Sequence, residues 1–247
     1  MNKYIPLIIA MLMAISRLAA AQSGQDVEKV MQVMIEVQAF YKARPQSFSI
    51  YYTYSNEHTP GKVLDSLNGK MELSGEYYRY IMGNTETIHN KHYTVVLFRE
   101  DMLMYVASSG SSGNQANPLL PMRESLEKAG ISRCEITHRG SQKQVQISLK
   151  EGSPYKHIEL TLDTLSKRLL SMRYIVKTAL LMDTQDTAPG SEYDEYAIVK
   201  AVLNNYKQLP VDERRFDEKQ FFSREGDKLK VTPAYKEYKI FIGSPNL

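Results

Sequence analysis

Histidine is the side chain of this sequence most suited to metal or proton chemistry, so the spacing of the histidines is a first test for an active site. The five histidines stand far apart in the chain: His58, His89, His92, His138 and His157. None of their spacings matches a metal-ligand motif. His89 and His92 are three residues apart but lie on either side of an expected turn. They could bind a metal ion together, or they could be two solvated residues of a hairpin. The spacing favours solvated residues, and we expect no metal site.

Nucleophilic chemistry is equally unsupported by the sequence. No G-x-S-x-G or H-E-x-x-H motif occurs. The glycines of Ser108–Asn117 lack the spacing of a phosphate-binding loop. Cys134, the only cysteine, falls in an expected strand without a neighbouring base, so we expect a buried and inert thiol. We therefore predict a protein that is not an enzyme and that needs no cofactor.

The first 21 residues have the three parts of a secretory signal. Lys3 supplies a short positive region, Tyr4–Ile15 is an apolar run, and Ala19-Ala20-Ala21 offers small residues for cleavage. The apolar run is shorter than the roughly 20 residues that a membrane-spanning helix needs, and Arg17 follows it. A retained anchor helix is the alternative. No cysteine follows the run, so no lipid attachment is expected there. The sequence thus predicts an exported, periplasmic protein of a Gram-negative envelope, soluble after cleavage and without a stable membrane anchor.

Charge and composition narrow the class of partner. The formal charge of the whole chain is +3, and loss of Lys3 and Arg17 with the signal would leave +1. Such a balance gives no reason to expect a nucleic acid partner. With one cysteine, an exported chain has no internal disulfide and depends on its core. The 17 Tyr and 12 Met suit an adaptable apolar cavity as well as an ordinary core.

Apolar residues at helical spacing predict one amphipathic helix over Ser23–Ala43. Ser23 and Asp26 resemble a capping box at its start, and Arg44-Pro45 ends it. One face of this helix is apolar and consists of Val27, Val30, Met31, Met34, Val37 and Tyr41.

After Pro45 the apolar period changes from 3.6 to two, which indicates strands. Tight turns separate short alternating runs from Phe48 to Val106, as expected for an antiparallel meander. A short helix is expected over Leu119–Ala129, followed by further strands from Ser132 to Thr178. Lys207–Asp227 is charged and irregular, and Tyr235–Ile242 could form a last strand.

Several short motifs in this strand region resemble one family of bacterial carriers. Gly69–Leu73 (GKMEL) is similar to a glycine-started strand, Tyr77–Tyr80 (YYRY) to the next strand, and Ile88–Tyr93 (IHNKHY) stands where a hairpin turn falls. Asn205–Pro210 (NYKQLP) is similar to the exit of the last barrel strand. Over roughly residues 23–222 the chain resembles the LolA/LolB-like family of outer-membrane lipoprotein carriers.

The resemblance implies a mostly β fold with helices, of the α+β type. Its sheet would be a strongly curved, incomplete antiparallel barrel, with the N-terminal helix and the short helix plugging the concave face. It implies one LolA-like domain over residues 22–247, with an additional C-terminal segment from about residue 223. Two positions depart from the family pattern, Ser74-Gly75 in place of Arg-Pro and Asn90-Lys91 in place of Asp-Gly. These departures bear on the lipoprotein-release mechanism more than on the fold.

An acyl-binding cavity is the site that the resemblance implies. The inward residues of the half-barrel would be the apolar members of its strands, with Phe48 beside them. The expected lining is Ile50, Tyr52, Met71, Leu73, Tyr78, Tyr80, Met82, Val95, Leu97, Met102, Met104 and Val106. Val30, Met31, Met34 and Val37 would form the lid helix. Simple packing of these strands against the helix is the alternative.

These expectations lead to a functional hypothesis. The chain would be a carrier or binding protein that accepts a lipid or lipoprotein acyl group. The alternative is an envelope sensor or secretion-system accessory protein that uses the same fold as a scaffold for cell-envelope proteins.

Processing of the N-terminus tests the first part of this hypothesis. Protein expressed in an exporting bacterial host should begin at Gln22 and carry no lipid, because cleavage after Ala21 leaves no nearby cysteine. Intact-mass spectrometry of the purified protein measures this. A mass that includes residues 1–21, or an added diacylglyceryl group, would contradict the expectation.

Overall fold

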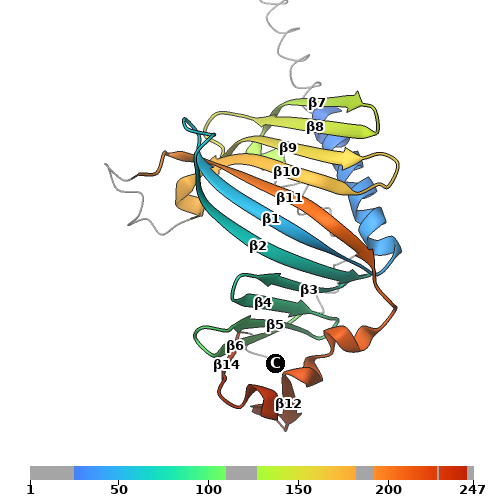
Figure 1. Cartoon of the computed structure of the whole chain (residues 1–247), viewed down its shortest axis with the longest axis vertical. Helices are drawn as coiled ribbons and strands as arrows, with labels where there is room; N and C mark the ends of the chain where they lie inside the picture. The colour runs from blue at the N-terminus through green and yellow to red at the C-terminus, as the bar shows by residue number, and fades with distance from the viewer. Residues whose placement is uncertain (1–24, 110–126, 182–191, 227, 244–247) are drawn as a thin grey trace, which may run out of the picture. The chain divides into compact units, whose positions relative to one another are not determined.

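The computed structural model describes residues 25–109, 127–181, 192–226 and 228–243, and its contacts divide the chain into two compact units (Figure 1). The first unit comprises Met1–Glu36, Asn56–His58 and Asn117–Ile198. The second comprises Val37–Ser55, Thr59–Ala116 and Val199–Leu247. The expected signal over residues 1–21 lies outside the described residues. Among the residues that are described, no helix is long and apolar enough to span a membrane.

The first unit is built on a four-stranded antiparallel meander. Its strands are β7 (Ile131–Arg139), β8 (Gln142–Leu149), β9 (Tyr155–Asp163) and β10 (Leu169–Lys177), each paired with the next. A short 3-10 turn, η1 (Thr178–Leu180), follows β10. Alternation along these strands puts Val145, Ile147 and Leu160 into the core, because one face of the meander is buried. Of the expected short helix over Leu119–Ala129, residues 127–129 are described and are helical.

The N-terminal helix covers residues 25–43, and its first part is anchored to β7 and β8. Asp26 is buried and accepts a 3.1 Å hydrogen bond from the backbone N–H of Cys134 in β7, and it pairs with Lys29 at 2.7 Å. Lys143 of β8 pairs with Glu36 at 2.9 Å. The Cys134 thiol is buried as expected, and this burial, with the Asp26 charge beside it, raises its pKa.

The second unit contains the six-stranded meander that the sequence predicts from Phe48 onward. Its strands are β1 (Gln46–Asn56), β2 (Val63–Ser74), β3 (Tyr77–Met82), β4 (Thr85–His89), β5 (Tyr93–Phe98) and β6 (Leu103–Ser108), each antiparallel to the next. Gly75 and Gly83 make the tight turns on either side of β3 at φ values of 64° and 54°, which glycine adopts without strain. β11 (Tyr196–Gln208) runs from the first unit into the second.

The expectation of a mostly β, antiparallel fold that is not closed into a barrel is confirmed. The hydrogen-bonded strand order has two ends, β14 (Lys239–Ile242) and β7, so the sheet is open. Figure 1 shows β1 and β2 as long strands that bend along their length. The last strand begins at Lys239 and not at Tyr235, because the residues before it form a 3-10 turn, η4 (Pro233–Tyr235).

Residues 213–242, which we call the C-terminal segment, pack onto one face of β4, β5 and β6. The segment contains η2 (Glu213–Phe216), η3 (Glu218–Gln220), the hairpin of β12 (Phe222–Glu225) and β13 (Lys228–Val231), η4, and β14, which lies parallel to β6. Figure 1 shows it in orange and red beside β5 and β6. Three of its four phenylalanines, each at most 2% exposed, join one core with five residues of the meander: Phe216, Phe221, Phe222, Ile88, Val95, Leu97, Met104 and Val106. We call this side of the meander the covered face.

Two phenylalanines of the C-terminal segment provide a matched test of this packing. Phe222 is 2% exposed in the core and Phe241 is 53% exposed. Phe222→Ala should lower the free energy of unfolding by about 3–5 kcal/mol, because it removes a buried ring and leaves a cavity. Phe241→Ala should change it by less than about 0.5 kcal/mol. Urea denaturation measures both, and equal effects would show that the segment is not part of the core.

Candidate functional site

Strand register assigns seven of the predicted ligand residues to the face opposite the covered face. Residues directly paired across antiparallel strands point to the same side of a sheet. Met71 pairs with Tyr80 and Leu73 pairs with Tyr78, while Gly69 pairs with Ile50 and with Met82. The residues on this side are Ile50, Tyr52, Met71, Leu73, Tyr78, Tyr80 and Met82. Because three tyrosines stand among them, we call it the tyrosine face.

The other five predicted ligand residues lie elsewhere. Val95, Leu97, Met104 and Val106 are on the covered face, each at most 1% exposed under the C-terminal segment. Met102 lies in the turn before β6, with φ of 52° and 45% of its surface exposed. The twelve residues therefore do not share one face. Both parities of β5 and β6 are apolar, so alternation could not show which side of these strands faces inward.

Three cross-strand rows make up the tyrosine face between β1 and β6. The central row continues onto β14 and consists of Phe48, Met71, Tyr80, Thr87, Val96, Tyr105 and Phe241. On one side of it, the second row consists of Ile50, Gly69, Met82, Thr85, Phe98, Leu103 and Lys239. On the other side, the third row consists of Gln46, Leu73, Tyr78, His89, Thr94 and Ala107. None of these positions holds a carboxylate. Exposure along the central row rises from 5% at Phe48 to 53% at Phe241.

The middle of this face is organised by the ring of Tyr80. A side chain at Gly69 would meet this ring, since a Cβ there would lie 3.4 Å from Tyr80 Cε2 and 3.2 Å from the Ile81 carbonyl oxygen. Glycine at this position therefore lets the ring lie over the strand. The Tyr80 hydroxyl is then 3.2 Å from the hydroxyl of Tyr52 and 3.0 Å from the sulfur of Met82.

The Phe48 end of the central row is closed by two further tyrosines of the second unit. The rings of Tyr41 and Tyr206 lie 5.5 Å and 4.9 Å from the Phe48 ring, and their hydroxyls are 3.0 Å apart. Tyr41 belongs to the last turns of the N-terminal helix. Of the predicted lid residues, Val30 and Met31 are buried in the first unit, whereas Met34 and Val37 are half-buried. Their role as a lid stays a prediction.

His89 is the basic side chain in the middle of the tyrosine face. Its ring stacks on Tyr78 at a centroid distance of 4.9 Å, and its Nδ1 lies 2.8 Å from the Thr94 hydroxyl. Burial lowers the pKa of His89, and the charge of Glu76 opposes this only in part. The imidazole is therefore neutral at pH 7, and the three rows carry no buried charge.

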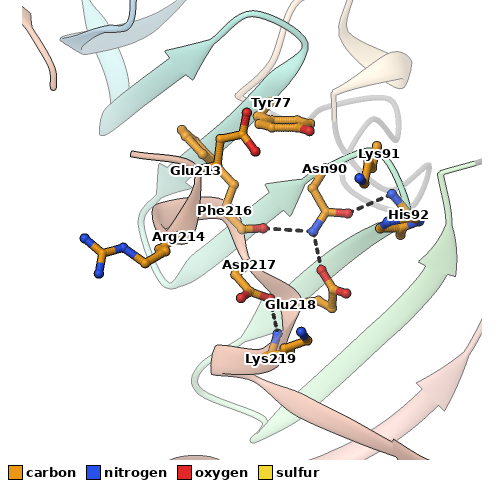
Figure 2. Close-up of a pocket in the computed structure, with 10 residues that line it drawn as sticks. All are labelled: Tyr77, Asn90, Lys91, His92, Glu213, Arg214, Phe216, Asp217, Glu218 and Lys219. Carbon is orange, nitrogen blue, oxygen red and sulfur yellow. Dashed lines mark hydrogen bonds between the residues drawn. The ribbon is translucent and has the colours of Figure 1, made fainter. Parts of the chain in front are cut away.

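A pocket of about 350 Å³, lined mostly by polar residues, lies where the C-terminal segment meets the turn between β4 and β5 (Figure 2). It is lined by Tyr77, Asn90, Lys91, His92, Glu213, Arg214, Phe216, Asp217, Glu218 and Lys219. Both charge signs occur in this lining, which gives the pocket no clear preference for a cation or an anion. Across the described residues, no three His, Cys, Asp or Glu side chains are grouped to hold a metal ion.

Asn90 in this pocket attaches the C-terminal segment to the turn between β4 and β5 by hydrogen bonds. Its side-chain amide donates to the Phe216 carbonyl at 2.9 Å and to Glu218 at 2.7 Å, as Figure 2 shows, and its oxygen accepts from the N–H groups of His92 and Tyr93. Both polar atoms of its side chain are thus hydrogen-bonded within the fold. Sequence reasoning placed Asn90 in a turn but missed this role, for which the only signal was an amide at a turn position.

The lowered pKa of His89 predicts a pH dependence of stability. Because the folded-state pKa lies below the unfolded value near 6.5, the folded protein loses stability as the pH falls from above 6.5 through the folded pKa. The pKa of His157 is lowered as well, so the comparison must isolate His89. His89→Gln should lose less stability than the wild type between pH 7.5 and pH 5.5 in urea denaturation. An equal loss, or an NMR titration of His89 near pH 6.5, would contradict this.

Comparisons with known proteins concern the fold. No family model and no curated protein matches the sequence. Among solved structures, an uncharacterized conserved protein from Thermus thermophilus has 8% identity and a TM-score of 0.47, over 87% of this chain and 99% of its own. A LolA superfamily protein from Nitrosomonas europaea has 6% identity and a TM-score of 0.35, over 76% and 97%. A putative outer membrane lipoprotein-sorting protein domain from Vibrio parahaemolyticus has 11% identity and a TM-score of 0.34, over 78% and 98%. The chain is similar to these structures in fold.

Proposed function

We propose that this protein is an exported, non-enzymatic carrier that accepts a lipid or lipoprotein acyl group on its tyrosine face. One observation carries the proposal: the face is mostly apolar, it is half-buried or exposed from β2 to β14, and its three rows hold no carboxylate. A soluble sheet normally turns charged side chains toward water on any face that is not buried. Large apolar surfaces left open are typical of sites that bind a ligand or a partner.

The chemistry of the face suits an acyl chain. Removing methylene groups from water contributes about 0.8 kcal/mol for each group that is buried. Met71 and Met82 adapt their shape to a flexible chain more easily than branched side chains do, and the tyrosine rings add large apolar surfaces. The covered face cannot serve in the same way, because Phe216, Phe221 and Phe222 already fill it.

A protein partner is the alternative occupant of the same face. The function would then be that of an envelope sensor or a secretion-system accessory protein. The two functions differ in what co-purifies with native protein: an organic extract that contains fatty material favours the carrier, and a stable complex with an envelope protein favours the scaffold.

A carboxylate placed on each face separates binding from folding. Met71→Glu should reduce binding of a fluorescent fatty acid at least about a hundredfold, because the carboxylate must lose its water without gaining a partner when the chain binds. Its thermal melt should stay near that of the wild type, since Met71 is only half-buried. Met104→Glu should unfold the protein, since the site is fully buried in the core. Val63→Glu, on an exposed position of β2, is the matched control and should change neither property.

Two results would overturn the proposal. Wild-type protein that never binds the probe would exclude acyl binding. Unaltered binding by Met71→Glu, with a normal melt, would place any bound chain away from the tyrosine face.

A further inference from the structure

Lys239 is the one lysine or arginine in the rows of the tyrosine face, and it stands at their open end. It pairs with Leu103 in the parallel register of β14 and β6, so its side chain lies on the same side as Phe241. Its backbone N–H donates to the Met102 carbonyl at 2.9 Å, which fixes the start of the strand. Among the described residues its ammonium has no ion-pair partner, whereas Lys70 and Lys143 are paired with carboxylates at 2.7 Å and 2.9 Å.

Beside Lys239 the face begins with exposed aromatic rings. Phe98, Tyr105 and Phe241 are 40%, 39% and 53% exposed. The Tyr105 ring extends over Gly243, so a side chain there would displace the ring. The face thus has an exposed cation at one end, then exposed rings, then half-buried apolar residues. This order is complementary to a single-chain amphiphile with an anionic head group.

The dimensions of the face agree with such a ligand. Four strand spacings separate β14 from β3, which corresponds to roughly 19 Å at about 4.8 Å for each spacing. One leaflet of a bilayer has a hydrocarbon layer of roughly 15 Å, half of the whole core. An acyl chain that starts at Lys239 and crosses β6, β5 and β4 would therefore end near Tyr80 and Met71.

From the charge and the length of this face, we propose that the ligand is a free fatty acid, with its carboxylate at Lys239 and its chain lying across the strands toward Tyr80 and Met71. This inference rests on the proposed function and narrows it. The acyl groups of a lipoprotein are amides and esters without charge, and they would leave the Lys239 ammonium without a partner. A free carboxylate supplies that partner.

Exchanging the charge at either end of the ion pair tests the head group. Wild-type protein should bind palmitate more tightly than palmitylamine, as measured by displacement of a fluorescent probe. Lys239→Met should weaken palmitate binding about two- to fivefold, the range of an exposed ion pair, and should not weaken palmitylamine binding. Lys239→Glu should reverse the preference.

Lys236→Met is the matched control and should leave both affinities unchanged. Lys236 is exposed next to the same strand, but it pairs with Glu237 at 3.8 Å. Because both lysines are exposed, all variants should melt like the wild type.

Photo-crosslinking tests the direction of the chain by a separate readout. Palmitate with a diazirine at its methyl end should label the peptide that contains Met71 and Tyr80. A diazirine next to the carboxylate should label Tyr105 or Phe241. The reversed order of labels would overturn the inference. If wild-type protein binds palmitate but the Lys239 variants keep the same preference, the fatty acid head is not read by Lys239 and only the broader acyl-binding proposal stands. If neither amphiphile binds, both proposals fail.

Discussion

Burial of three phenylalanines of the C-terminal segment against the covered face is the interaction on which the arrangement of the second unit depends. A twisted meander with apolar residues on both sides has to bury at least one side to be stable. Phe216, Phe221 and Phe222 supply that burial from within the same chain. The tyrosine face, on the other side of the meander, is left partly exposed.

Charged groups at the edge of this core make the docking specific. Glu86 is fully buried and is paired with Arg79 at 2.6 Å and with Arg99. Burial by itself would raise the pKa of Glu72, but the hydrogen bond from Lys70 and the charges of Lys70 and Arg215 outweigh it, and the pKa lies below its ordinary value. Arg215 belongs to the C-terminal segment, and its guanidinium lies 3.4 Å from Glu72. A buried charge left without its partner is strongly destabilising. The contact of Arg215 with Glu72 therefore favours one position of the segment over others.

The tyrosine face combines the properties that a binding surface for a variable apolar ligand needs. Its methionines are adaptable, the hydroxyl of Tyr80 pairs with that of Tyr52, and its histidine is neutral at pH 7. Exposure rises from Phe48 toward Phe241, which gives the face a closed end and an open end. Half-buried aromatic rings keep such a surface compatible with water while it is empty, because each tyrosine has one polar atom.

Local sequence patterns by themselves determined the element types of this protein. Alternation with turn residues predicted the meander from β1 to β6, and helical spacing predicted the helix over residues 25–43, because both signals lie within one element. Alternation could not show which face of β5 and β6 is buried, because successive residues of β5, Val95, Val96 and Leu97, point to opposite faces and are all apolar. Only the tertiary structure decided it, since it depends on a segment more than a hundred residues later in the chain. The part of that segment up to Asp227 has a charged and irregular sequence, and only the folded structure shows that Phe216, Phe221 and Phe222 within it pack against the sheet.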